Sequence, residues 1–141
     1  MSTSAAVATA VTFVWMGMVL AISFVEAPLK FQAPGVTVPI GLGIGRLVFR
    51  VLNLVEGLFA LVLLIAGVTH MPGTSVMVAA ASAVGALLVQ LTVVRPHLSR
   101  RSDVVLAGGD APYSLAHHWY IALEVLKIAA LLVTGSLLLA E

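Results

Sequence analysis

Residues 44–68 of the chain read IGRLVFRVLNLVEGLFALVLLIAGV. The run from Leu58 to Ile65 is wholly apolar, and every charged side chain of the stretch lies before it. A helix needs about 20 apolar residues to cross a membrane, so this stretch is long enough for one crossing. Charge within hydrocarbon is costly, and the charged half of the stretch is therefore a candidate functional region.

Three other stretches are long and apolar enough to cross, which predicts an all-α integral membrane four-helix bundle with up-down-up-down topology. The chain is too short for a second domain, so we expect residues 1–141 to form a single transmembrane domain. The predicted spans cover residues 5–26, 44–68, 74–94 and 114–139. The two long loops cover residues 27–43 and 95–113.

The composition excludes several classes of function. Of the 141 residues, 61% are hydrophobic and 9% are charged, whereas soluble chains carry roughly 25% charged residues. There is no cysteine, which excludes disulfides, thiolate metal sites and cysteine nucleophiles. The net charge of +1 offers no basic patch for nucleic acid. The first four residues lack the basic segment of a signal peptide, so we expect the first span to be retained.

The distribution of basic residues predicts the orientation in the membrane. Two connections carry them, with Lys30 and Arg46 in the first and Arg95, Arg100 and Arg101 in the third. The N-terminus and the turn at 69–73 carry none. The positive-inside rule therefore places both long loops in the cytoplasm and both termini outside it.

Prolines mark the predicted ends of two spans. Pro28 is expected to close the first span and Pro96 the third. The apolar connection 31–45 contains Pro34, Gly35 and Pro39 and cannot form a span, so an interfacial or re-entrant segment is predicted there.

A displacement of 68 residues relates two parts of the chain. Glu56 follows Pro28 by 28 residues, and Glu124 follows Pro96 by the same number. At this displacement Arg50 also aligns with His118. Two parallel hairpin repeats would produce this pattern, as in transporters built from repeats, although two hairpins of similar length can also match at a few positions by chance.

Polar residues follow one face of the fourth span and one face of the second. At 100° per residue, a stripe of about 80° holds four side chains of the fourth span: His117, Tyr120, Glu124 and Lys127. A similar stripe of the second span holds Arg46, Arg50 and Asn53, with Glu56 at its edge. We expect these groups to form a polar pocket open to the cytoplasm.

Roles within this pocket follow from residue type. Glu56 and Glu124 are the protonatable groups; Arg50, Asn53, His117, Tyr120 and Lys127 complete the ligand or proton site. Lys30, Arg46 and Arg95 would attract an anion. The alternative is a neutral ion-pair network that only fixes the register of the helices.

Metal and cofactor sites are poorly supported by the spacing. A di-iron bundle needs Glu-x-x-His on two helices, but Phe59 follows Glu56 by three residues and Lys127 follows Glu124. A single-metal site from Glu56, Glu124 and His117 is weaker than the ligand interpretation. We therefore expect no metal and no cofactor.

Three glycines precede Arg46, and they have two interpretations. Gly41, Gly43 and Gly45 could expose helix amides to a phosphate or carboxylate. Close packing of helices at Gly41 and Gly45 is the favoured interpretation. A lipid headgroup bound between Arg46, Arg50 and Arg95 would combine the anion site with close helix packing.

The segments Gly17–Phe31 and Gly43–Asn53 resemble uncharacterised bacterial four-span membrane proteins. Their layout is similar to that of the eukaryotic transmembrane protein associated with cisplatin resistance, although this chain lacks the cysteines and longer loops of the eukaryotic proteins. The resemblance covers most of the chain. It implies the fold and a bacterial inner (plasma) membrane location, and it implies no substrate.

The sequence leaves three functions open. The leading one is a small inner-membrane protein that binds a small polar or anionic ligand and moves it with protons, as a homo-oligomer because four helices rarely enclose a path alone. The second is a non-catalytic accessory subunit of a larger membrane complex. The third is a membrane enzyme acting on a lipid or isoprenoid, with Glu124 and His117 as acid and base.

Overall fold

The computed structural model describes residues 1–109 and 115–141. All regular structure in these two ranges is helical. Four continuous helices are long and apolar enough to cross a membrane, which confirms the predicted four-helix bundle and a multi-pass membrane protein. They cover Thr3–Gln32, Val38–Thr69, Thr74–Leu106 and His117–Ala140.

The first of these helices changes its winding along its length. It begins as α1 (Thr3–Val19), widens into the π-helix η1 (Leu20–Glu26), returns to α-helix as α2 (Ala27–Leu29) and ends as the 3₁₀ turn η2 (Lys30–Gln32). The second helix is α3 (Val38–Thr69). The third consists of α4 (Thr74–Val89), the π-helix η3 (Gln90–Val94) and α5 (Arg95–Leu106), and the fourth is α6 (Leu115–Ala140).

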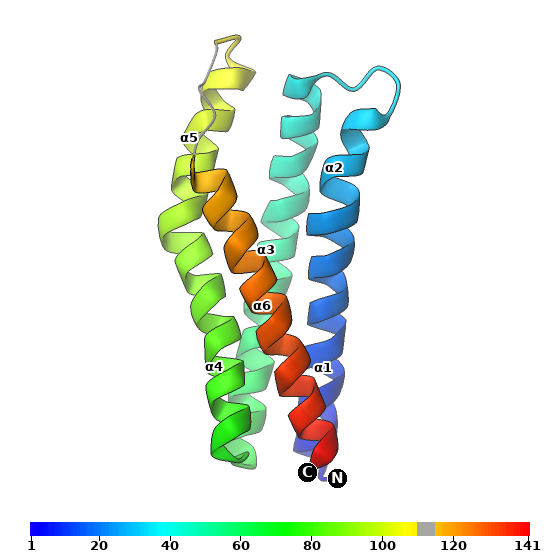
Figure 1. The fold of residues 1–141 in the computed structure, drawn as a ribbon, viewed down its shortest axis with the longest axis vertical. Helices are drawn as coiled ribbons and strands as arrows, with labels where there is room; N and C mark the ends of the chain where they lie inside the picture. The colour runs from blue at the N-terminus through cyan, green and yellow to red at the C-terminus, as the bar shows by residue number, and fades with distance from the viewer. Residues whose placement is uncertain (110–114) are drawn as a thin grey trace.

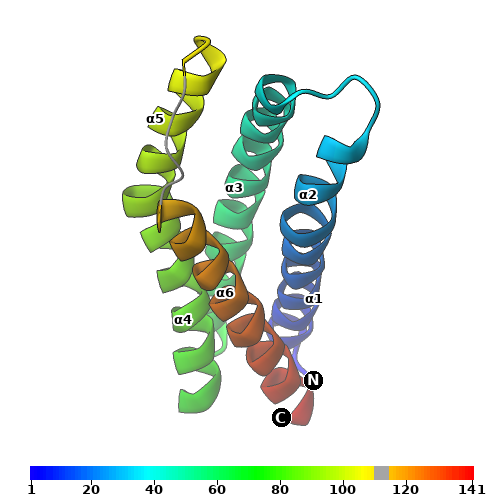
Figure 2. The same cartoon turned by 45° about the horizontal axis from the view of Figure 1, so that its top comes forward.

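The helices run up and down with both termini at one end (Figure 1). Figure 2 shows that the ribbons spread apart toward the opposite end, where α2, α5 and the start of α6 lie. Small residues let α4 approach α6 closely, since Ala79, Ala83 and Ala86 are buried there. Trp15, Ala83 and Leu131 belong to the hydrophobic core between the helices.

The two prolines predicted to end spans do not end them. Pro28 and Pro96 each lie in the first turn of a new α-helical segment that continues the same rod. Proline removes one backbone donor and crowds the preceding turn. Here the turn before each proline is widened, because the Ala27 N–H bonds to the Ile22 carbonyl and the Arg95 N–H bonds to the Gln90 carbonyl.

These two wide turns are themselves displaced by 68 residues, like Glu56 and Glu124. The pairs Ala27–Ile22 and Arg95–Gln90 occupy equivalent places in the two hairpins. The structure therefore adds a backbone feature to the sequence pattern that suggested two parallel repeats.

The predicted loops are largely helical. The loop 95–113 contains α5, and the remaining predicted loop residues 110–113, with Ser114, lie outside the described residues. In the segment 31–45, predicted to be interfacial or re-entrant, the residues from Val38 onward are helical, because α3 begins there. Pro39 lies in its first turn, where proline is favoured, and the Thr37 hydroxyl accepts a hydrogen bond from the Ile40 N–H.

Candidate functional site

A buried ammonium group lies at the centre of the polar residues. The side chain of Lys127 on α6 is fully buried, and its Nζ lies 2.5 Å from Glu56 Oε1 and 2.6 Å from Glu124 Oε1. Nζ also donates a hydrogen bond of 2.8 Å to Gln90 Oε1. The three N–H donors of the ammonium group thus have three oxygen acceptors.

All four spans contribute to this network. Trp15 on α1 donates its indole N–H to Glu56 Oε1 at 2.9 Å, and Ser23 on η1 donates its hydroxyl to Glu124 Oε2. Gln90 on η3 donates its amide to Glu124 Oε1 at 2.7 Å. The wide turns position two of these groups, because Ser23 and Gln90 both lie in π-helical segments.

The network has an uneven charge. Two carboxylates share one ammonium group, so the ionised cluster carries a formal charge of −1 in a buried place. Glu56 Oε2 is also buried, and no described residue donates a hydrogen bond to it. An unmatched buried charge is costly. A single proton on the cluster would remove that charge.

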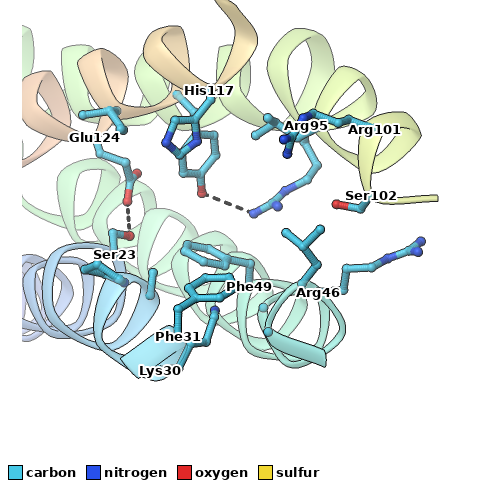
Figure 3. Close-up of a pocket in the computed structure, with 18 of the residues that line it drawn as sticks. Ser23, Lys30, Phe31, Arg46, Phe49, Arg95, Arg101, Ser102, His117 and Glu124 are labelled. Carbon is cyan, nitrogen blue, oxygen red and sulfur yellow. Dashed lines mark hydrogen bonds between the residues drawn. The ribbon is translucent and has the colours of Figure 1, made fainter. Parts of the chain in front are cut away.

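A cavity of about 530 Å³ opens beside the network, at the end away from the termini. Figure 3 shows its polar wall: Glu124 and Ser23 lie at one side, and Arg95 extends between the helices. Of the three charged network residues, Glu124 lines the cavity, whereas Glu56 and Lys127 lie behind it. Glu124 therefore joins the cavity to the buried network.

Arg95 on α5 presents its guanidinium group inside this cavity. The group stacks at 5.0 Å from the ring centroid of Phe49 and 5.1 Å from that of Tyr120. Its Nη2 donates a hydrogen bond of 3.3 Å to the Tyr120 hydroxyl, marked by a dashed line in Figure 3. Its Nε is buried and has no acceptor among the described residues. A buried donor without an acceptor is costly, and an anion would supply one.

Other basic side chains also line the cavity. Lys30 lies over the rings of Phe31 and Phe49 and is 3.8 Å from Glu26. Arg46 forms a 2.6 Å ion pair with Asp103 on α5. Arg101 and His117 complete this side of the cavity.

Most predicted site residues come together, but Arg50 and Asn53 do not join them. Arg50 is exposed, Asn53 is half-buried, and neither lines the cavity. Of the predicted stripe on α3, Arg46 lines the cavity, whereas Arg50 is six positions from Glu56 and lies about 120° away from it around the helix. The inward face instead carries Phe49, Leu52 and Glu56.

The structure also identifies residues outside the predicted site. Trp15, Ser23 and Gln90 are direct partners of the two glutamates, and Phe49 supports Arg95. Phe49 precedes Glu56 by seven residues and so shares its face, a signal that the sequence already contained. Ser23 and Gln90 depend on the π-turns, for which the sequence offered no signal except the prolines that follow.

No group of three His, Cys, Asp or Glu side chains that could hold a metal ion lies within residues 1–109 and 115–141. No protein-family model matches the chain, and neither a curated protein nor a solved structure matches it. The resemblance to four-span bacterial proteins therefore stays a prediction. The function has to be argued from the geometry of the site.

Proposed function

We propose that the protein binds a small anionic ligand in the cavity beside Glu124 and that binding is coupled to a proton held by Glu56 and Glu124. The single observation that carries this proposal is Arg95, a cation inside the cavity whose buried Nε–H has no acceptor among the described residues. An oxygen of a carboxylate or phosphate is the natural acceptor for this group.

The cavity suits such a ligand in size and charge. Its volume of about 530 Å³ lies within the usual range of small-molecule sites. Among the described residues, the basic side chains that line it are Lys30, Arg46, Arg95 and Arg101, and the acidic one is Glu124. Tyr120 and His117 supply hydrogen-bonding groups that would orient the ligand.

The buried network supports the coupling to protons. Glu124 touches both the cavity and Lys127, so an anion that enters the cavity acts on the charge of the whole cluster. An anion beside Glu124 adds to the net negative charge of the ionised cluster, and a proton on the cluster would remove that charge. Binding and proton uptake would therefore assist each other.

The proposal also specifies which side of the membrane the cavity faces and the oligomeric state of the protein. The cavity would face the cytoplasm of a bacterial inner membrane, as the basic residues of the two long connections predict. At the end nearest the termini the helices pack around apolar side chains such as Ala8, Ala66 and Val76, which offer no polar path for an anion. Movement of the ligand across the membrane would therefore require a homo-oligomer.

The test is native mass spectrometry of the protein extracted gently from its own membrane. We expect a homo-oligomer that retains a non-protein anion, lost in Arg95→Gln and retained in the matched control Arg50→Gln. An adduct that Arg95→Gln leaves unchanged would contradict the proposal. Recovery of the protein with other polypeptides and no small molecule would instead support the accessory-subunit function.

A further inference from the structure

We infer that the ligand of this cavity is an amphiphile from the membrane, with one anionic headgroup and an apolar chain, which reaches the cavity sideways between η1 and α6. This inference rests on the proposed function, because it assigns a chemical class and a route to the same site. Three features support it: the apolar lining of the cavity, the exposure of lining residues on η1 and α6, and the position of Arg95 and Lys30.

The walls of the cavity are mainly apolar. Aromatic and aliphatic side chains from all four spans line it: Phe24, Phe31, Leu42, Phe49, Leu98 and Ile121. A small hydrated anion would leave this apolar surface in contact with water, whereas an alkyl chain would remove it from water at about 25 cal/mol per Å². The walls therefore favour a ligand that has a hydrocarbon part.

The side between η1 and α6 is open to the surroundings. Phe24 on η1 is 38% exposed and Ile121 on α6 is 40% exposed, and both side chains also line the cavity. Both helices belong to segments long and apolar enough to cross a membrane, and on this inference lipid chains lie beside Phe24 and Ile121. A lipid chain can therefore contact the cavity without passing through water.

A hydrogen bond forms the floor of this opening. Ser23 on η1 donates its hydroxyl to Glu124 on α6 (Figure 3). Phe24 follows Ser23 directly, and Ile121 precedes Glu124 by three residues, about one helical turn. Below this point α6 packs against α1, so the opening ends at the level of the buried network. A headgroup that enters here meets Glu124 on one side and Arg95 on the other.

The basic groups lie where the headgroup of such a ligand would lie. Arg95 offers its Nε–H inside the cavity, and Lys30 also lines it. The Lys30 Nζ occupies the space beside Gly45, since a Cβ added to Gly45 would lie 2.9 Å from it. Gly45 thus leaves room for the ammonium group of Lys30 against α3.

A phosphate monoester and a carboxylate share this chemistry, and the experiment separates them. The protein is placed in nanodiscs of phosphatidylcholine that contain dodecyl phosphate or laurate, and bound amphiphile is counted by native mass spectrometry. Inorganic phosphate and acetate serve as water-soluble competitors. We expect one dodecyl chain per protomer, retained against an excess of the soluble anion.

Variants at the opening test the route. Ile121→Trp narrows the gap between η1 and α6 and should slow exchange of the amphiphile at least several-fold. Val125→Trp is the matched control, because Val125 is exposed on the same helix and does not line the cavity. Phe24→Ala widens the gap and should speed exchange of the amphiphile. This variant still tests the route if Ile121→Trp fails to fold.

The outcomes separate this inference from the proposed function. Binding of inorganic phosphate or acetate that depends on Arg95, without binding of either amphiphile, would overturn the lipid ligand and leave the proposed function standing. Failure of both kinds of anion to bind would overturn both. Exchange in both Ile121→Trp and Phe24→Ala at the rate of the Val125→Trp control would overturn the lateral route.

Discussion

Lys127 Nζ and Glu56 Oε1 lie 2.5 Å apart with both side chains fully buried. The ion pair joins α6 to α3, and Glu124 completes it from the turn before Lys127. Replacing the ammonium group would leave two carboxylates facing each other in a buried place. The stability of the bundle and the chemistry of the cavity therefore depend on the same three side chains.

Removal of the ammonium group should be the most damaging change in the network. Lys127→Met is expected to lower the free energy of unfolding by about 3–5 kcal/mol, because it leaves buried carboxylates without their cation. The measurement is unfolding in mixed micelles with increasing dodecyl sulfate, followed by far-ultraviolet circular dichroism.

A second substitution controls for loss of packing. Glu56→Gln should restore part of the stability lost in Lys127→Met, because one of the uncompensated charges disappears. If the double variant is as unstable as the sum of the two single variants, the loss is due to packing and the charge argument fails.

The indole N–H of Trp15 should contribute measurably to stability. Trp15→Phe removes the donor that bonds to Glu56, and hydrogen bonds to charged groups contribute about 1.5–3 kcal/mol. Trp119→Phe is the control, since Trp119 is 64% exposed and its replacement should change stability by about 0.5 kcal/mol or less. Similar effects of the two variants in the same unfolding experiment would contradict the assigned hydrogen bond.

Two glycines on α3 should respond differently to alanine. A Cβ on Gly41 would collide with the ring of Phe31, whereas a Cβ on Gly43 would meet nothing within 4 Å. Gly41→Ala is therefore expected to destabilise the protein by about 1–3 kcal/mol through overpacking. Gly43→Ala should be neutral or slightly stabilising, since alanine favours helix more than glycine. The measurement is the midpoint of thermal unfolding of the two variants. Equal midpoints would rule out the close contact between Gly41 and Phe31.

The surface ion pair should contribute little to stability. Arg46 and Asp103 are 37% and 60% exposed, and exposed pairs contribute about 0.2–1 kcal/mol. Asp103→Asn should therefore leave unfolding almost unchanged and reduce its dependence on salt concentration. A loss as large as that of Lys127→Met would show that this end of the bundle is buried in an assembly.

The sequence was sufficient to predict the four spans, because runs of about 20 apolar residues leave few alternatives. It was not sufficient to predict that the first and third helices continue past their prolines. Pro28 and Pro96 were expected to end spans, and the widened turns before them allow the helices to continue instead. Close packing at Gly41 was predicted and is confirmed by its contact with Phe31.

The site could be predicted in its acidic residues but not in its full partner set. Glu56 and Glu124 stand out because carboxylates within apolar stretches are rare. Arg50 was grouped with Glu56 because Glu56 lies at the edge of the polar stripe that holds Arg50, although the buried face of α3 carries Leu52 and Glu56. That choice depends on how α3 is rotated against α1, which the sequence pattern left open.

The most direct test of an anion at Arg95 is nuclear magnetic resonance of the arginine Nε–H groups, with dodecyl phosphate and inorganic phosphate as probes. The resonance of Arg95 should shift with saturation when one of these anions is added, because its buried Nε–H gains an acceptor. The exposed Arg50 serves as an internal control and should show no saturable shift. Shifts of equal size at both arginines, or none at Arg95 with either anion, would contradict the account.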